Sequence, residues 1–143
     1  METTIIKVIH LQRLEMFADI PSEQLAQIAD LCKEVHYAAG EVIYATDDAA
    51  TAMYILIDGE VKITRKGIVT QKIGKDEALG VWGFFDRNPR LYTATALKDS
   101  YLLKLDSTDF FDLIEDRIRV SQGLIKFLVK KIRSLVEVND QLV

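Results

Sequence analysis

The chain has 143 residues, which suits one domain with a single hydrophobic core and is too short for two domains of ordinary size. Apolar residues make up 49% and charged residues 28%, a composition that excludes a disordered or low-complexity chain. The 18 Lys and Arg residues against 22 Asp and Glu residues leave a formal net charge of −4, so no general attraction for nucleic acid phosphate is expected. We therefore expect a single domain over residues 1–143 that contacts neither nucleic acid nor a membrane directly.

The chain begins with two helical stretches, which we place within residues 1–33. Residues 3–17 carry apolar side chains at helical spacing, and Pro21 opens a second stretch that continues to Cys32. The apolar run near the N-terminus is interrupted by charged side chains and is too short for a signal peptide or a membrane span. Cys32 is the only cysteine, which excludes an internal disulfide and favours a reducing cytoplasm.

Short strands separated by turns then follow between residues 34 and 106. They are expected at residues 40–44, 53–57, 61–64, 68–73, 91–97 and 101–105. Asp58-Gly59 predicts a tight hairpin, because both central residues of a type I′ turn need positive φ, and Lys66-Gly67 predicts another turn. This pattern indicates a closed or sandwich-like antiparallel barrel, so we expect a mainly β fold with flanking helices.

Residues 107–143 are expected to be helical. Asp106 and the residues after it carry side-chain oxygens that can cap the start of a helix. A long final helix begins near Arg117, and its heptad pattern places Ile118, Ile125, Ile132 and Asn139 at one core position and Ser121, Leu128, Leu135 and Leu142 at the other. This pattern favours a parallel two-stranded coiled coil, and hence a homodimer. The alternative is that the helix packs only against its own domain.

Residues 74–90 form a distinct segment between the strands. A short helix near Gly80 and a guanidinium group at Arg90 would together suit one phosphate group. The alternative for Arg90 is an ordinary solvated position on a strand. Trp82 is expected to anchor the core, with ligand stacking or a switch role as the alternative.

The order of these elements resembles the cyclic nucleotide-binding domain family, the sensor modules of the catabolite activator and of protein kinase A regulatory subunits. The resemblance covers nearly the whole chain and is carried by Leu14-Glu15-Met16-Phe17, Ala39-Gly40-Glu41-Val42-Ile43-Tyr44, the segment from Met53 to Val61, Leu79-Gly80 and Asn88-Pro89-Arg90. It implies a double-stranded β-helix, the jelly-roll barrel also found in cupins, with a phosphate-binding cassette at residues 79–90 and a long C-terminal helix. It also implies a non-catalytic regulatory module that signals by reordering this cassette and helix.

The resemblance implies a ligand site made of Gly80, Val81, Trp82, Gly83, Arg90, Leu91 and Tyr92. In the family, the cassette amides and the arginine bind the cyclic phosphate, and a glutamate directly after the cassette glycine binds the ribose 2′-hydroxyl. Gly80 and Arg90 match this pattern, but Val81 stands at the position of the glutamate. A charge-assisted hydrogen bond contributes about 1.5–3 kcal/mol, so we expect binding of cyclic AMP to be weakened tens- to hundreds-fold or lost.

Other positions also depart from the family. Leu91 stands where some members use a threonine to contact guanine, and Tyr92 replaces a small residue, so we expect a bulkier pocket wall. Three turn positions that are glycine in the family are Asp47, Ala50 and Asp76. Asp accepts the left-handed conformation moderately well, whereas Ala50 predicts a changed turn.

Three functions stay open. The chain is a sensor with weak or lost cyclic nucleotide binding, a competent sensor of cyclic AMP or another phosphate-bearing ligand through Arg90, or a dimerisation scaffold. Catalysis is not expected, because metal-dependent cupin enzymes need several His and carboxylate ligands, whereas the only histidines here are His10 and His36, both expected to be structural. Cys32 is expected to be a small buried residue rather than a nucleophile. No metal or cofactor is expected, and no helix-turn-helix pattern precedes Val143, so a DNA-binding half is not expected in this sequence.

Overall fold

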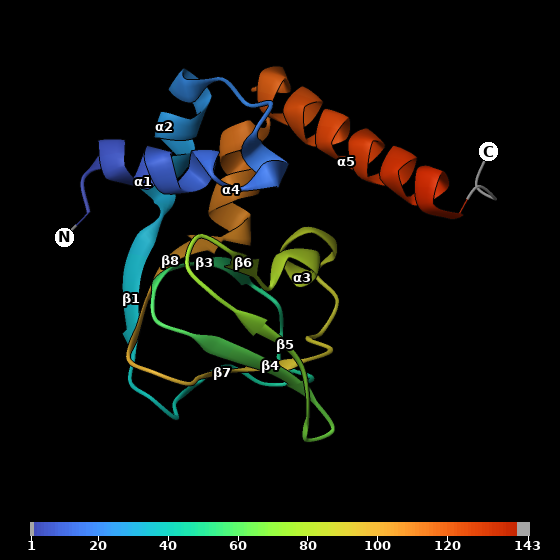
Figure 1. Cartoon of the computed structure of the whole chain (residues 1–143). Coiled ribbons are helices and arrows are strands. Elements are labelled where there is room, and N and C mark those ends of the chain that lie inside the picture. Colours follow the sequence, from blue (N-terminus) through green and yellow to red (C-terminus); the bar gives the residue numbers. More distant parts are fainter. Residues whose placement is uncertain (1, 140–143) are drawn as a thin grey trace.

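Two four-stranded antiparallel sheets form the β part of the protein in the computed structural model, which describes residues 2–139 (Figure 1). The first sheet has the order β1 (Lys33–Tyr37), β8 (Ser100–Asp106), β3 (Ala52–Asp58) and β6 (Ala78–Leu79), and the second has the order β2 (Val42–Tyr44), β7 (Thr93–Ala96), β4 (Val61–Arg65) and β5 (Ile68–Ile73). The predicted mainly β fold with flanking helices is confirmed. Within the described residues no strand of one sheet pairs with a strand of the other, so the sandwich-like form of the prediction holds and the closed barrel does not.

The helices lie toward one end of the sheets (Figure 1). They are α1 (Thr4–Gln12), the short 3-10 helix η1 (Glu15–Phe17), α2 (Ser22–Leu31), α3 (Val81–Asp86), α4 (Ser107–Ile114) and α5 (Ile118–Asn139). The single helix predicted for residues 3–17 is wrong, because the backbone at Leu14 is extended and separates α1 from η1. The predicted cap of α4 is confirmed, since the Asp106 carboxylate accepts hydrogen bonds from the N–H groups of Thr108 and Asp109.

Strand β3 is buried on both faces, which explains why its sequence is an almost continuous apolar run. Met53 and Ile55 pair in register with Leu105 and Leu103 of β8, and all four side chains pack against the helices. Because successive side chains of a strand point to opposite faces, Leu56 packs instead into the cluster between the two sheets. Strand β3 therefore joins the helical layer to the second sheet.

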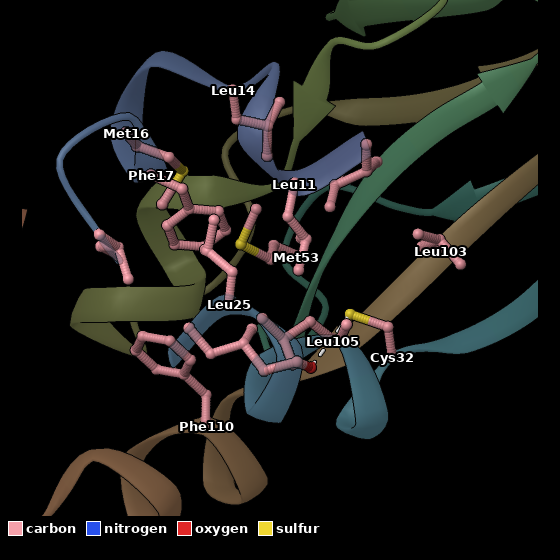
Figure 2. Packing of buried hydrophobic residues seen from close by; sticks show 14 of the residues in the cluster. Leu11, Leu14, Met16, Phe17, Leu25, Cys32, Met53, Leu103, Leu105 and Phe110 are labelled. Carbon is pink, nitrogen blue, oxygen red and sulfur yellow. Dashed lines mark hydrogen bonds between the residues drawn. The ribbon is translucent and has the colours of Figure 1, made fainter. Parts of the chain in front are cut away.

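The cluster between the first sheet and the helices is the larger of the two (Figure 2). Leu25 of α2, Phe17 of η1 and Phe110 of α4 are almost completely buried in it. Truncating a buried Phe to Ala typically costs about 3–5 kcal/mol, so these side chains fix α4 and the N-terminal helices on the sheet. Cys32 is also buried here, and its burial raises the pKa of the thiol to about 12, so it is not a nucleophile at neutral pH.

Asp58-Gly59 does not form a hairpin, so the prediction is wrong at this position. Strand β3 pairs with β6 and β8, and strand β4 pairs with β5 and β7, so the chain passes from one sheet to the other at this turn. Only Gly59 has a positive φ (115°), and a Cβ atom there would lie 2.3 Å from Oγ of Ser100. The turn at Lys66-Gly67 is confirmed, with φ values of 52° and 78°, and it joins β4 to β5.

Helix α5 packs one of its sides against its own domain. Val120 is fully buried, and a Cβ atom on Gly123 would lie 2.8 Å from Cγ1 of Ile20, so the two backbones approach closely there. Further along, Lys130 Nζ lies 2.8 Å from a carboxylate oxygen of Asp19. None of the helices that the structure describes has both the length and the apolar character needed to cross a membrane.

The predicted heptad residues of α5 lie mainly on its outer side. Those that are more than half exposed are Ile118, Ile125, Leu128, Ile132 and Leu135, whereas Ser121 is half-buried. The helix extends away from the sheets (Figure 1), so these residues do not serve the core of their own domain. The predicted positions Asn139 and Leu142 lie outside the residues whose side chains the structure describes.

A polar cluster connects α1 to the turn between β5 and β6. Asp76 has a φ of 65°, and its two carboxylate oxygens lie 3.0 Å from Nδ1 of His10 and 2.9 Å from Nη1 of Arg13. Burial alone would raise the pKa of Asp76, but the hydrogen bonds and positive charges of His10 and Arg13 outweigh it and hold the pKa below its ordinary value. The ionised carboxylate therefore stabilises the packing of α1.

Asp76→Asn tests this cluster without changing the turn, since Asn also accepts a left-handed backbone. The stabilisation by the carboxylate is fully present above its ordinary pKa of 3.8 and is lost as the pH falls through the lower pKa of the folded state. We expect the variant to have a lower free energy of unfolding in urea at pH 7, and the difference from the unchanged protein to shrink as the pH is lowered toward about 3. A difference that is constant with pH would contradict this assignment.

Candidate functional site

The segment after β6 folds into a short helical cassette. Gly80 begins it in the left-handed conformation, with a φ of 74°, and Arg87 ends α3 in the same conformation, with a φ of 62°. The chain then returns through residues 88–92 to β7. The backbone of Arg90 pairs on both sides with the turn after β2, since its N–H donates to the Asp48 carbonyl at 2.9 Å and its carbonyl accepts from the Asp47 N–H at 2.7 Å.

The side chain of Arg90 is buried, with 6% of its surface exposed. Its Nη1 donates to the Gly80 carbonyl at 2.9 Å, its Nη2 donates to the Ala52 carbonyl, and its Cζ lies 4.1 Å from the centre of the Tyr44 ring. The alternative of an ordinary solvated position is therefore wrong for Arg90. The guanidinium group connects the cassette to β2 and β3.

No carboxylate neutralises Arg90 among residues 2–139. Both of its hydrogen bonds go to neutral carbonyl groups, and its buried Nε has no hydrogen-bond partner. The face of the Tyr44 ring attracts a cation but carries no net charge. Because a buried charge is costly unless it is paired, Arg90 is the strongest attractor for an anion in this region.

Two cassette glycines are required by close contacts. A Cβ atom on Gly80 would lie 2.6 Å from Nη1 of Arg90, and one on Gly83 would lie 2.3 Å from Cβ of Ala50. Ala50 is buried against Gly83 and does not adopt a positive φ, whereas Asp47 does, with a φ of 73°. The left-handed conformation predicted for Asp47 is confirmed, whereas a turn at Ala50 that differs from the family's stays a prediction.

A pocket of about 570 Å³ lies beside Arg90. All the predicted site residues line it: Gly80, Val81, Trp82, Gly83, Arg90, Leu91 and Tyr92. The predicted cassette also contributes Leu79, Asp86, Asn88 and Pro89. Residues that the sequence did not indicate complete the wall: Tyr44, Ile63, Thr70, Gln71, Ile73 and Ala78. Tyr44 is the most important of these, because it contacts the guanidinium group, and burial raises the pKa of its hydroxyl despite the nearby charge of Arg90. No sequence pattern indicates that Tyr44 contacts Arg90, because the two residues lie far apart in the chain.

Trp82 is not a core residue, so this prediction is wrong. Its side chain is 72% exposed at the pocket, whereas Phe84, two residues later, is fully buried. A helix as short as α3 can turn only one face to the core, and Phe84 occupies that face in contact with Phe110. Trp82 is left at the rim of the pocket.

Comparisons with known proteins agree with this fold. The model of the cyclic nucleotide-binding domain family matches residues 34–117, more than half of the chain. The fold and site define a regulatory domain of that kind, and the chain belongs to the cyclic nucleotide-binding domain family.

Three similar proteins show the range of this likeness. The CRP-like cAMP-activated global transcriptional regulator of Mycobacterium tuberculosis is 24% identical over 128 residues, which are 86% of this chain and 57% of that protein. A lysophospholipase of Aspergillus niger is 27% identical over 108 residues, 72% of this chain but 7% of that protein. The N-terminal domain of a transcriptional regulator from Streptomyces coelicolor has a crystal structure with a TM-score of 0.83 and 27% identity, covering 94% of this chain and 97% of that one. The chain thus spans little more than half of the mycobacterial regulator.

Gly80→Ala tests the contact between the cassette and Arg90, and Gly67→Ala is its matched control. Both glycines have nearly the same φ, 74° and 78°, but nothing lies within 4 Å of a Cβ atom on Gly67. Each substitution carries a left-handed backbone cost of about 1–2 kcal/mol. Gly80→Ala also displaces the guanidinium group, and we expect a further loss of about 1–3 kcal/mol in the free energy of unfolding. Equal losses in urea unfolding would show that the guanidinium contact contributes nothing.

Proposed function

We propose that this chain is a non-catalytic sensor domain that holds an anionic ligand at Arg90 and binds cyclic AMP weakly or not at all. The observation that carries the proposal is Val81. Its half-buried side chain lines the pocket next to Gly80, whose carbonyl accepts from Arg90, and it has no atom able to accept a hydrogen bond from a ribose hydroxyl. The phosphate-binding half of the site is therefore present and the ribose-binding half is absent.

A competent cyclic AMP sensor is the second candidate. Two observations favour it: Arg90 is buried, and all seven predicted site residues line the same pocket. Leu91 offers no hydroxyl group to a guanine edge, so there is no reason for cyclic GMP to bind better than cyclic AMP. Calorimetric titration with both nucleotides separates the candidates, since a sub-micromolar affinity for cyclic AMP supports the competent sensor and a much weaker one supports our proposal.

Val81→Glu places a carboxylate where the ribose would lie and tests the reason for the weak binding. We expect this variant to bind cyclic AMP about ten- to a hundredfold more tightly than the unchanged protein, because one charge-assisted hydrogen bond is gained. Val81→Gln is the matched control. Gln has nearly the same shape as Glu but no charge, so this variant should gain less affinity for cyclic AMP. Calorimetry measures all three proteins, and an affinity that Val81→Glu leaves unchanged would contradict the proposed role of position 81.

We further propose that the domain forms a homodimer through α5. Gly123 and Val120 lie on the side of α5 that packs against its own domain. Ile118, Ile125 and Ile132 are exposed at heptad spacing on the other side. Leu128 lies between them, and Ile at the first core position with Leu at the second favours a parallel pair of helices. The exposed apolar residues support an interface, because contiguous apolar surface of this kind is uncommon on a monomer.

Ile125→Asp tests the dimer, and Ser134→Asp is its control. Both residues are exposed on α5, but Ser134 lies outside the heptad core positions. We expect the unchanged protein and Ser134→Asp to dimerise as the concentration rises, and Ile125→Asp to stay monomeric with an unchanged circular dichroism spectrum, because it places two like charges in the apolar contact. Light scattering over a concentration series measures this, and a strict monomer of the unchanged protein up to about millimolar concentration would rule out the dimer.

The remaining proposals concern the setting in which the domain works. We propose that it acts in the cytoplasm, carries no enzymatic activity of its own and does not bind nucleic acid directly. The net charge of −4 supports the last point, and the buried, unreactive Cys32 supports the absence of a cysteine nucleophile.

A further inference from the structure

The charge of Arg90 selects for an anion, and the rest of the pocket determines what that anion is attached to. Val81 follows Gly80 in the chain and Leu91 follows Arg90, and both line the pocket with apolar side chains. Ile63 and Ile73 add further apolar surface. A ligand held by its anionic group at Arg90 therefore meets mainly hydrocarbon.

The polar side chains of the pocket are largely engaged or unsuitable for binding hydroxyl groups. The Thr70 hydroxyl already donates to the Ile63 carbonyl at 3.2 Å. The Asp86 carboxylate accepts from the Asn88 N–H at 2.9 Å and repels a second anion. Gln71 and the side chain of Asn88 are exposed at the rim. Apart from the hydroxyls of Tyr44 and Tyr92, the pocket side chains therefore offer few fixed hydrogen-bond partners to the hydroxyl groups of a sugar.

Aromatic side chains at the rim suit a flat ligand. Trp82 is 72% exposed and Tyr92 is half-buried, and both line the pocket. Rings stack on such side chains in offset or edge-to-face arrangements that are favourable beyond the area they bury. The surface that is unsuited to a sugar is thus suited to an aromatic ring.

We infer that this pocket selects a small anion with an apolar, hydroxyl-poor body, such as an aryl phosphate or an aryl carboxylate, over a sugar phosphate. The inference rests on the proposed anion site at Arg90 and adds the ligand class. The anionic group pairs with the charge of Arg90, which no carboxylate neutralises among residues 2–139, and the ring packs on Val81 and Leu91. Each ribose hydroxyl buried without a partner weakens binding, which sets the order of affinities.

Phenyl phosphate and ribose 5-phosphate form a matched pair of probes, because they carry the same phosphate monoester on an apolar and on a hydroxylated body. Binding is followed by calorimetry and by the fluorescence of Trp82, the only tryptophan of the chain. We expect phenyl phosphate to bind at least about tenfold more tightly than ribose 5-phosphate. Phenylacetate and inorganic phosphate complete the set, and they show whether a carboxylate replaces the phosphate and how much affinity the anion supplies alone.

Two variants keep the test decisive. Leu91→Ser changes a half-exposed wall residue from apolar to polar, and we expect it to reduce the preference for phenyl phosphate over ribose 5-phosphate. Val81→Glu supplies an internal carboxylate close to Arg90 and should weaken phenyl phosphate and phenylacetate while strengthening cyclic AMP. The two opposite changes in one protein cannot arise from misfolding.

The outcomes separate this inference from the proposed function. Equal affinities for phenyl phosphate, ribose 5-phosphate and inorganic phosphate would overturn the ligand class but leave the anion site in place, and tighter binding of ribose 5-phosphate would do the same. Phenyl phosphate binding that persists in Arg90→Gln would overturn the inference, because the charge would then play no part. If no anion and no cyclic nucleotide binds either the unchanged protein or Val81→Glu, both the inference and the proposed anion site fail.

Discussion

The buried guanidinium group of Arg90 is the interaction on which the cassette depends. It joins the carbonyl of Gly80 to that of Ala52 on β3 and lies over the Tyr44 ring of β2, so one side chain ties three parts of the chain together. Its charge is nevertheless unpaired within the described residues. The same group supports the fold, so if an anion binds there as we propose, ligand binding and cassette stability are thermodynamically linked: an anion that pairs with Arg90 stabilises the arrangement that binds it.

The cassette is also connected to the helices that carry the predicted dimer surface. The N–H of Phe84 donates to the Gly80 carbonyl, the same carbonyl that accepts from Arg90. The Phe84 ring lies 5.0 Å from that of Phe110, and the Ser107 hydroxyl donates to the Phe84 carbonyl at 2.9 Å. Helix α4 therefore rests directly on the cassette, and α5 follows it in the chain. A change at Arg90 reaches α5 through packed contacts if the cassette has two arrangements that ligand binding favours unequally.

Much of the fold follows from local sequence patterns, whereas the long-range contacts do not. The alternating strands, the Asp106 cap and the Lys66-Gly67 turn depend on neighbouring residues and were predictable. Strand β6 has two residues, too few to show a period, and Asp58-Gly59 mimics a hairpin although Gly59 is required by its approach to Ser100. Gly80 and Arg90 were indicated as a phosphate site by the residues themselves, whereas the other site residues could be predicted only from the resemblance to a family. Neither Tyr44 nor the exposure of Trp82 could be, because both depend on how distant segments pack.

The most direct test of the role of Arg90 is to observe its Nε–H group by proton–nitrogen correlation NMR, with the signal assigned by its loss in Arg90→Lys. Nε has no hydrogen-bond partner among the described residues, so its N–H signal reports a change in the surroundings of the guanidinium group. We predict that this signal shifts progressively as inorganic phosphate is added and that the signals of the exposed arginines respond far less. An Arg90 signal that stays unchanged while phosphate or cyclic AMP binds would contradict the assignment of this buried cation as the anion site.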